Sequence, residues 1–308
     1  MTEPLALRSL HILLQVLTAL LLPPLLPGLI NKVKARVAGR TGPPVLQLYR
    51  DLAKLARKPA VLSRTTTPVF LLGPVATVAV GLTAALLVPF GHVPAPVHFQ
   101  GDMIVLAYLF GLARFAVVLA ALDTGSSFEG MGAAREVTFA ALAEPSLFLG
   151  FAALARSSGS LSLSVLLGST SLALSRASGP LVLVLAGWVI VFLAENARIP
   201  VDDPDTHLEL TMIHEVMILD HSGRPLALAQ YGASLKLLVL GALILGLVLP
   251  RTHQGGLDWL AFYAGLGLLC LAVGLIESCT ARFRMAKVSQ FLVAGLLASA
   301  FAFFLLQA

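Results

Sequence analysis

The chain has 308 residues, of which 57% are hydrophobic and only 12% are charged. Soluble domains carry about 25% charged residues, so this composition excludes an ordinary soluble enzyme and indicates an integral membrane protein. The formal net charge of +5 does not point to nucleic-acid binding, because nine of the 21 lysines and arginines lie within residues 31–67.

Eight stretches are long and apolar enough to cross a membrane, since a span needs about 20 mainly apolar residues. In chain order they are residues 5–30, 68–90, 103–122, 133–155, 180–197, 231–250, 257–278 and 288–306. The first is interpreted as a retained helix, because its apolar run is longer than the core of a cleaved signal. The sequence therefore predicts an all-α integral membrane protein, a single transmembrane domain over residues 1–308 with about eight transmembrane helices.

Residues 161–175 are apolar as well, but they are too few to cross a membrane and they alternate leucine with serine. Alternation with a period of two is typical of a strand rather than a helix. We therefore expect an extracytoplasmic loop there, with local strand character.

The distribution of positive charge predicts how the spans are oriented. Residues 31–67 and the other loops on the same side hold fifteen lysines and arginines, whereas the opposite side holds Arg8, Arg156, Arg176 and Arg251. Cytoplasmic loops are the ones enriched in these residues, so we expect the 31–67 loop in the cytoplasm and both termini outside it. The chain is accordingly expected to be a multi-pass protein of the cell (inner) membrane.

The basic loop, residues 31–67, contains a predicted cytoplasmic amphipathic helix at residues 45–56. Apolar side chains such as Leu48 and Leu55 repeat there at helical spacing, and basic ones such as Lys54 cover the other face. A basic amphipathic helix beside a span is expected to lie in the plane of the lipid headgroups. The alternative is that this helix serves only as an anchor for anionic lipid.

Six ionisable residues fall inside the predicted spans, where each costs about 2.5–3.5 kcal/mol on insertion scales: Arg114, Glu136, Glu144, Glu195, Lys236 and Glu277. They come from five helices and lie toward the cytoplasmic side, with Glu144 the deepest carboxylate. If they converge, they form a hydrated polar funnel suited to proton movement, because neighbouring like charges raise carboxylate pKa values. The alternative is that residues near helix ends, such as Glu136 and Glu277, extend their side chains to the interface.

Residues 198–230 form a predicted acidic cytoplasmic loop, in which two arginines face six acids: Asp202, Asp203, Asp205, Glu209, Glu215 and Asp220. Asp203-Pro204 is typical of a helix start, and apolar residues follow at helical spacing: Leu208, Met212, Val216 and Leu219. Histidines recur every seven residues at His207, His214 and His221. Because no His-Glu-x-x-His zinc motif is present, we expect solvated or proton-buffering histidines and no metal.

The run Glu195-Asn196-Ala197-Arg198-Ile199-Pro200-Val201-Asp202 resembles the signature of subunit 1 of respiratory complex I, although Val201 replaces an aromatic residue. Further matches are Arg40-Thr41-Gly42-Pro43, residues 51–54, Glu144 and Ala281-Arg282-Phe283-Arg284. Within that family the chain is most similar to the membrane subunits of energy-converting nickel–iron hydrogenases of the hydrogenase-4 and formate hydrogenlyase type. That similarity rests on Leu122-Asp123-Thr124-Gly125-Ser126, Ala134-Arg135-Glu136, Ala143-Glu144-Pro145 and Pro200-Val201-Asp202-Asp203-Pro204, which leads into His207-Leu208-Glu209-Leu210.

The resemblance implies a subunit that anchors a soluble hydrogenase arm and couples electron transfer to proton or sodium translocation. No catalytic residue or metal is expected on this chain, since the two cysteines, Cys270 and Cys279, are too few for an iron–sulfur or nickel site. The expected proton path comprises Glu144, Glu195, Glu136, Asp202, Glu209, Glu215, Arg114, Lys236 and Glu277. The expected partner interface comprises Arg198, Asp202, Asp203, Asp205, Arg40, Arg282 and Arg284.

The expected partners are membrane lipid, the large and small (iron–sulfur) soluble hydrogenase subunits, which would carry the nickel–iron and iron–sulfur centres, and antiporter-like membrane subunits, with no nucleic acid. Two alternatives stay open. One is the quinone-binding subunit of a complex I-like NADH–quinone oxidoreductase, which would bind a quinone. The other is a stand-alone ion-coupled transporter, which is less favoured because the sequence shows no convincing internal repeat.

Overall fold

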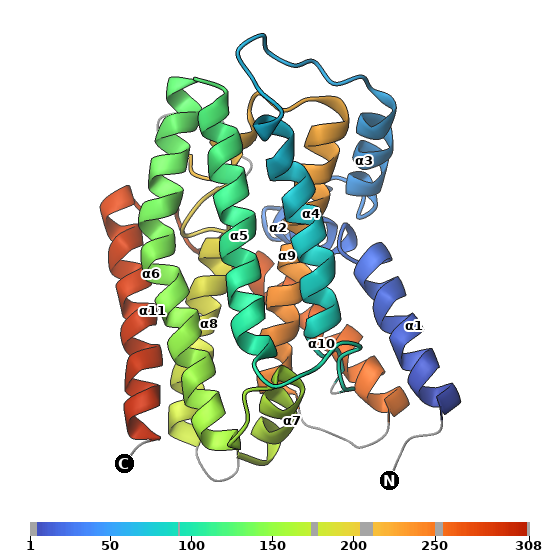
Figure 1. The fold of residues 1–308 in the computed structure, drawn as a ribbon, viewed down its shortest axis with the longest axis vertical. Helices are drawn as coiled ribbons and strands as arrows, with labels where there is room; N and C mark the ends of the chain where they lie inside the picture. Colours follow the sequence, from blue (N-terminus) through green and yellow to red (C-terminus); the bar gives the residue numbers. More distant parts are fainter. Residues whose placement is uncertain (1–4, 92, 174–177, 204–211, 250–254, 307–308) are drawn as a thin grey trace.

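The computed structural model of the chain describes residues 5–91, 93–173, 178–203, 212–249 and 255–306. These residues form an elongated bundle of α-helices without a strand among them (Figure 1). The helices are α1 (Leu5–Leu21), α2 (Leu25–Val37), α3 (Gln47–Arg57), α4 (Val69–Leu87), α5 (Asp102–Asp123), α6 (Ser127–Ser158), α7 (Leu163–Ala173), α8 (Ser178–Glu195), α9 (Gly223–Val248), α10 (Gly255–Cys279) and α11 (Met285–Leu305), with a 3₁₀ turn, η1 (Glu215–Ile218), before α9. The predicted all-α class is confirmed.

Six of the described helices are long and apolar enough to cross a membrane alone, namely α4, α5, α6, α9, α10 and α11. The bent pair of α1 and α2 gives a seventh span if it is counted as one, and α8 is a shorter apolar helix. The chain is therefore a multi-pass membrane protein, and the predicted number of eight spans is approximate.

The predicted first span, residues 5–30, is broken into two helices. α1 ends at Leu21 and α2 begins at Leu25, with an angle of 55° between them. The cause lies in the consecutive prolines Pro23 and Pro24, which lack the N–H groups that would continue a helix. Two tyrosine hydroxyls satisfy carbonyls at the bend: Tyr49 donates to the Leu21 carbonyl, and Tyr231 donates to the Leu20 carbonyl at 3.0 Å.

The expectation of a loop with strand character at residues 161–175 is wrong, because Leu163–Ala173 forms the helix α7. The start of α7 is fixed by Asp102, at the beginning of α5. The Asp102 carboxylate accepts hydrogen bonds from the Leu163 amide at 2.6 Å and from the Ser162 hydroxyl at 3.1 Å. The first bond satisfies a backbone amide that a helix leaves free at its N-terminus, and the second fixes the residue before it. Alternation of leucine and serine does not reveal this contribution.

The helix α9 is the centre of the bundle. In its most apolar 18 residues 78% are buried, against 28–44% in the other five long helices. Helices α3, α4, α7, α8 and α10 all pack on it. Most residues in the apolar part of α9 therefore face protein rather than lipid, which bears on Lys236 in that part.

The predicted amphipathic helix at residues 45–56 is present as α3. It runs antiparallel to the first turns of α9: its last turn lies at Arg224, whose Nε donates to the Ala56 carbonyl at 3.3 Å. α3 therefore stands along α9 instead of lying across the end of the bundle (Figure 1). The chain before α3 passes so close to α2 that a Cβ on Gly28 would lie 2.0 Å from the Val45 carbonyl oxygen, so only glycine fits there.

Several helices extend beyond the predicted spans at the end of the bundle that carries α3. α6 begins at Ser127, and α9 begins at Gly223, inside the predicted 198–230 loop. Hydropathy marks only the apolar part of a helix, so polar turns that continue it are missed. The helix start predicted at Asp203-Pro204 involves residues 204–211, which lie outside the described residues. Beyond them, Met212 and Val216 are buried and Leu219 is exposed.

Candidate functional site

Arg114, on α5, binds three carboxylates at once. Its Nε donates to Glu136 Oε1 at 3.0 Å, and its two terminal nitrogens donate to Glu144 and Glu195. The planar guanidinium has donors on several sides, so one arginine can serve carboxylates from α6 and α8 together. Only 10% of the Arg114 side chain is exposed. The structure therefore brings together four of the residues that the sequence placed at similar depth.

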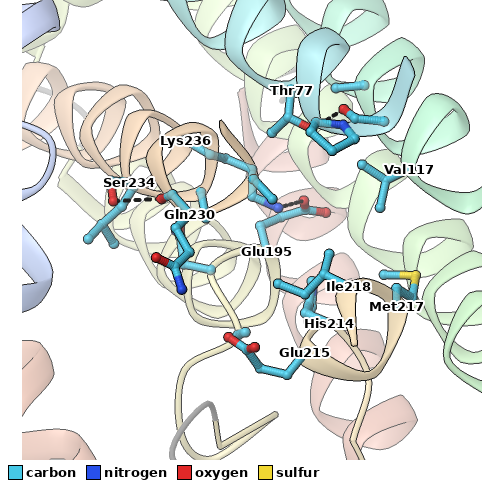
Figure 2. A pocket seen from close by; sticks show the side chains of 18 of the residues that line it. Thr77, Val117, Glu195, His214, Glu215, Met217, Ile218, Gln230, Ser234 and Lys236 are labelled. Carbon is cyan, nitrogen blue, oxygen red and sulfur yellow. Dashed lines mark hydrogen bonds and ion pairs between the residues drawn. The ribbon is translucent and has the colours of Figure 1, made fainter. Parts of the chain in front are cut away.

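Lys236, on α9, completes what we call the Arg114 cluster: Arg114, Glu136, Glu144, Glu195 and Lys236. Its ammonium group donates to Glu195 Oε2 at 3.3 Å, as Figure 2 shows. Glu195 is thus held between a guanidinium and an ammonium group. Such buried charges are tolerated only when they are paired and hydrogen-bonded, and this cluster meets that condition with four helices.

His214 connects the Arg114 cluster to the segment that precedes α9. Its Nε2 lies 3.2 Å from Glu136 Oε2, and its Nδ1 lies 3.5 Å from Asp202 Oδ2. Burial alone would lower the pKa of His214, but the two carboxylates outweigh burial and raise that pKa above its usual value. The imidazolium form is therefore favoured, because a carboxylate oxygen lies within 3.5 Å of each ring nitrogen.

Asp202 organises the chain around His214. Its carboxylate accepts the backbone N–H groups of Ile213 and His214, both at 3.1 Å, and the guanidinium of Arg282 at 2.9 Å. Burial would raise the pKa of Asp202, but His214 and Arg282 outweigh burial and lower it. Asp202 is therefore an ionised carboxylate that joins the end of α8, the segment before α9 and the segment after α10.

Residues 212–222 are held against the first turns of α6 by three contacts. Arg135 donates to the Met212 carbonyl at 2.8 Å, and Glu129 accepts the Asp220 amide at 3.0 Å. Gly132 faces Val216 so closely that a Cβ on it would lie 2.3 Å from the valine methyl carbon. Glu129 was not among the predicted site residues, because its partner is a backbone amide that only the fold brings near.

Glu277 belongs to a separate buried cluster. Its carboxylate lies 3.0 Å from the ammonium of Lys34 on α2 and accepts a bond of 3.4 Å from Arg198. Among the described residues no ion pair joins this carboxylate to the Arg114 cluster. Glu277 therefore does not converge with the other intramembrane charges. Its partner Arg198 is nevertheless only four residues from Asp202, which contacts His214.

A cavity of about 340 Å³ opens beside the Arg114 cluster, between α4, α5, α8, α9 and η1. It is lined by polar and charged residues such as Glu195, His214, Glu215 and Lys236 and by apolar residues such as Val117 and Ile218 (Figure 2). Besides the ring nitrogens of His214, which lie near carboxylates, four buried polar atoms of the lining have no hydrogen-bond partner among the described residues: Asn196 Oδ1, Arg198 Nε, His221 Nδ1 and Gln230 Oε1. Because buried polar groups are nearly always satisfied, these atoms indicate that the cavity holds water or a polar ligand.

Glu144 lies on the far side of Arg114 from His214. It is the eighteenth residue of α6, so it lies about 26 Å from the start of that helix at 1.5 Å per residue. Its side chain is 43% exposed, which is far more than the other acids of the cluster. A small cavity of about 20 Å³ lies between Glu144, Arg114 and Glu195, enough for one water molecule.

Residues 10–308 match the sequence profile of the NADH dehydrogenase family. The chain belongs to this family. It is 35% identical over 268 residues to formate hydrogenlyase subunit 4 of Escherichia coli strain K12. The aligned region covers 87% of this chain and 85% of that protein. It is also 35% identical over 266 residues to hydrogenase-4 component C of the same organism, with 86% and 82% covered.

More distant members of the NADH dehydrogenase family include a subunit of the NADH-quinone oxidoreductase of Verminephrobacter eiseniae, 27% identical over 81% of this chain and 74% of that protein. The fold is similar to that of a chain in the membrane-bound sulfane sulfur reductase, an archaeal respiratory membrane complex. The TM-score is 0.78, with 97% of this chain and 99% of that chain covered and 19% identity. The resemblance seen in the sequence is thus confirmed: the chain is a multi-pass membrane protein of the NADH dehydrogenase family, similar to subunits of two hydrogenase complexes.

The residues expected at a partner interface differ in their exposure: some are buried and others are exposed or half-buried. Arg198 and Asp202 are buried, and Arg282 points to Asp202. Arg40 and Arg284 are exposed and Asp203 is half-buried. Asp205 and Glu209 lie outside the described residues, and Glu215 lines the large cavity.

His214 is the main site residue that the sequence reading did not single out. A seven-residue spacing would place the histidines on nearly one face of a helix, but the described part of that segment forms only the single turn η1. His214 and His221 therefore have different surroundings: His221 contacts the ring of Phe70, and burial lowers its pKa to about 4. The adjacent Asp202, His214 and Glu136 could have been related only by knowing the fold.

Proposed function

We propose that this chain is the anchoring and coupling subunit of an energy-converting nickel–iron hydrogenase of the hydrogenase-4 and formate hydrogenlyase type, linking electron transfer in a soluble arm to proton or sodium translocation. The observation that carries the proposal is the continuous series of charge contacts from Asp202, through His214 and Glu136, to Arg114 and Glu144. It connects the segment before α9 to the middle of α6. The 35% identity to two hydrogenase subunits supports the choice of complex.

In the proposed path, protons enter from the large cavity, where Glu215 and His214 meet the aqueous side, and pass to Glu136 and Glu195. Arg114 and Lys236 stabilise the ionised acids, while Glu144 passes the proton onward through the water-sized cavity beside it. Glu209, and Glu277 with its partners, remain proposed contributors at the entrance. A buried path of this kind needs carboxylates, water and fixed cations in alternation, because an isolated buried charge is too costly.

The proposed docking surface for the soluble arm consists of the exposed Arg40 and Arg284 and the half-buried Asp203, together with Asp205. The nickel–iron and iron–sulfur centres are proposed to lie on the large and small partner subunits. The two thiols of this chain support that assignment, because Cys270 is buried and Cys279 lies apart from it at the end of α10. Antiporter-like membrane subunits and lipid are the proposed neighbours within the membrane.

The proposed orientation places α3 and η1 on the cytoplasmic side and both termini outside, in the cell (inner) membrane. In Figure 1 the beginning of α1 and the end of α11 lie at one end of the bundle and α3 lies at the other, which agrees with two termini on the same side. The choice of side rests on the charge distribution alone. The basic residues of the 31–67 loop are then cytoplasmic, as the charge distribution of membrane proteins requires.

The experiment that tests the function is affinity purification of the complex through this chain, followed by reconstitution into liposomes. We expect a nickel–iron large subunit to copurify and turnover with hydrogen to build an uncoupler-sensitive ion gradient. If a flavin-containing module copurifies in place of a nickel–iron subunit, the hydrogenase assignment is wrong.

The cavity of about 340 Å³ favours one second candidate, a quinone-binding subunit of a complex I-like oxidoreductase. Ligand pockets of small molecules commonly measure about 300–1,000 Å³ and combine apolar walls with a few polar groups, as this cavity does. A photoreactive quinone added to the purified complex would label residues of this cavity if the candidate is correct. Labelling elsewhere, or none above that of a heat-denatured sample, would exclude it.

A further inference from the structure

Among the described residues, His214 alone contacts both a carboxylate of the Arg114 cluster and the carboxylate of Asp202. Glu136 lies on α6, within the membrane-spanning part of the bundle, whereas Asp202 lies in the segment that follows α8. The two acids therefore meet only through one imidazole ring. Any movement of one acid away from the ring changes the charge that the ring experiences.

The two sides of His214 are held with different firmness. Glu136 belongs to a regular helix and is also bound by Arg114. Asp202 belongs to an irregular segment, and its position depends on two backbone amides and on Arg282. A force on the segment before α9 would therefore displace Asp202 more readily than Glu136.

We propose that His214 is a positioning residue that couples the position of Asp202 to the protonation of Glu136. With Asp202 in place, the ring is an imidazolium between two carboxylates. When Asp202 withdraws, the Nε2–H bond breaks and an O–H bond forms on Glu136 Oε2. The ion pair becomes a neutral imidazole and a neutral carboxylic acid, so the transfer conserves both the proton and the total charge.

The groups that surround His214 set the direction of this transfer. Carboxylates on two sides stabilise the imidazolium, while burial and the ammonium of Lys236 oppose it. Loss of Asp202 leaves the opposing effects in place and removes one of the two stabilising ones. The charged groups facing the ring from the surrounding elements are Glu136 from α6, Glu195 from α8, Lys236 from α9, Asp202 and, through Glu136, Arg114 from α5.

The coupling is reciprocal. A proton that reaches Glu136 by another route weakens its attraction for the imidazolium, which then depends more on Asp202. If the proton on Glu136 comes from elsewhere, His214 stays charged and holds Asp202 and the segment before α9. If the proton comes from His214, the ring becomes neutral and that hold is weaker. The inference rests on the proposed function only for its use in ion coupling, because the contacts stand whichever complex contains the chain.

The experiment is a histidine titration in the purified complex, in which isotope-labelled histidine in this chain is followed by nuclear magnetic resonance. The His214 signal is assigned by its absence in His214→Gln. Asp202→Asn keeps an oxygen acceptor for the backbone amides but removes the charge, and we expect it to lower the pKa of His214 by about one unit or more. Asp203→Asn is the matched control, since it makes the same charge change at the adjacent residue and should shift that pKa far less.

Glu136→Gln provides a second measurement that leaves Asp202 and its partners in place. It removes the charge of the carboxylate on the other side of the ring, so the pKa of His214 should also fall. An unchanged pKa in Asp202→Asn or in Glu136→Gln, or an equal shift in Asp203→Asn, would overturn the proposal. The titration involves no ion transport, so a failure of the proposed function in liposomes is distinguishable from a failure here.

Discussion

Trp188 of α8 lies directly against Gly150 of α6. A Cβ added to Gly150 would lie 2.1 Å from Trp188 Nε1, and the indole also packs edge-on against Phe151, with ring centroids 5.0 Å apart. Small residues let transmembrane helices approach closely in this way. The contact fixes the distance between the two helices that supply Glu144 and Glu195 to Arg114.

The first prediction is that Gly150→Ala destabilises the subunit by about 1–3 kcal/mol, because an extra methyl in a packed interface forces the indole or the helix to move. The measurement is the unfolding midpoint of the purified complex. Gly267→Ala on α10 is the control, since nothing lies within 4 Å of its added Cβ. Equal midpoints for the two variants would contradict the packing argument.

The second prediction is that Glu144→Gln leaves the complex assembled but reduces ion pumping several-fold. Assembly survives because Arg114 keeps Glu136 and Glu195 as partners, so the substitution does not leave a buried arginine unpaired. Proton uptake into liposomes, normalised to hydrogenase turnover, is the measurement. Loss of the subunit from the membrane would show that Glu144 is structural instead.

The third prediction is that Arg114→Met, unlike Glu144→Gln, prevents assembly of the subunit. It removes the common partner of three carboxylates and should destabilise the subunit by about 3–5 kcal/mol. Immunoblots of membranes should show little assembled subunit. A fully assembled complex at the wild-type level would mean that water replaces the guanidinium without cost.

The fourth prediction concerns pH. Because the folded-state pKa of His214 is raised, its contribution to stability is full below its unfolded pKa of about 6.5 and is lost as the pH rises through the folded value. The stability advantage of wild type over His214→Gln should therefore shrink on going from pH 6 to pH 9. Unfolding midpoints across this range measure it, and an advantage that grows with pH would contradict the assignment.

His221 gives a fifth prediction of opposite sign. Its pKa is lowered to about 4, so the folded state resists protonation that the unfolded state accepts. Stability should fall as the pH drops from about 6.5 toward 4, and His221→Gln should reduce this fall. The same midpoints at pH 7 and pH 4.5 test it. A similar acid sensitivity in both proteins would assign the effect to other groups.

The sequence was informative where one physical signal decides the structure. Apolar runs of about 20 residues located the helices, and the apolar stripe of the 31–67 loop located α3. Buried charges such as Arg114 and Glu195 were expected to converge, since lipid cannot satisfy them, and they do.

The remainder depended on contacts between distant parts of the chain. α7 begins where it does because Asp102, 61 residues before Leu163, accepts its first amide. His214 gains its two carboxylates only after α6 and the segment following α8 come together. Glu277 was expected in the same group as Glu195, but depth alone does not show which side of a helix a residue occupies, and it pairs with Lys34 instead.

The threefold binding of Arg114 sets a capacity for the site. Three carboxylates share two cations in the Arg114 cluster, and the imidazolium of His214 beside Glu136 supplies the third positive charge. With every group ionised the set is therefore neutral, and a proton added to it leaves an uncompensated cation among buried helices until another proton departs. The arrangement thus favours the exchange of one proton at a time.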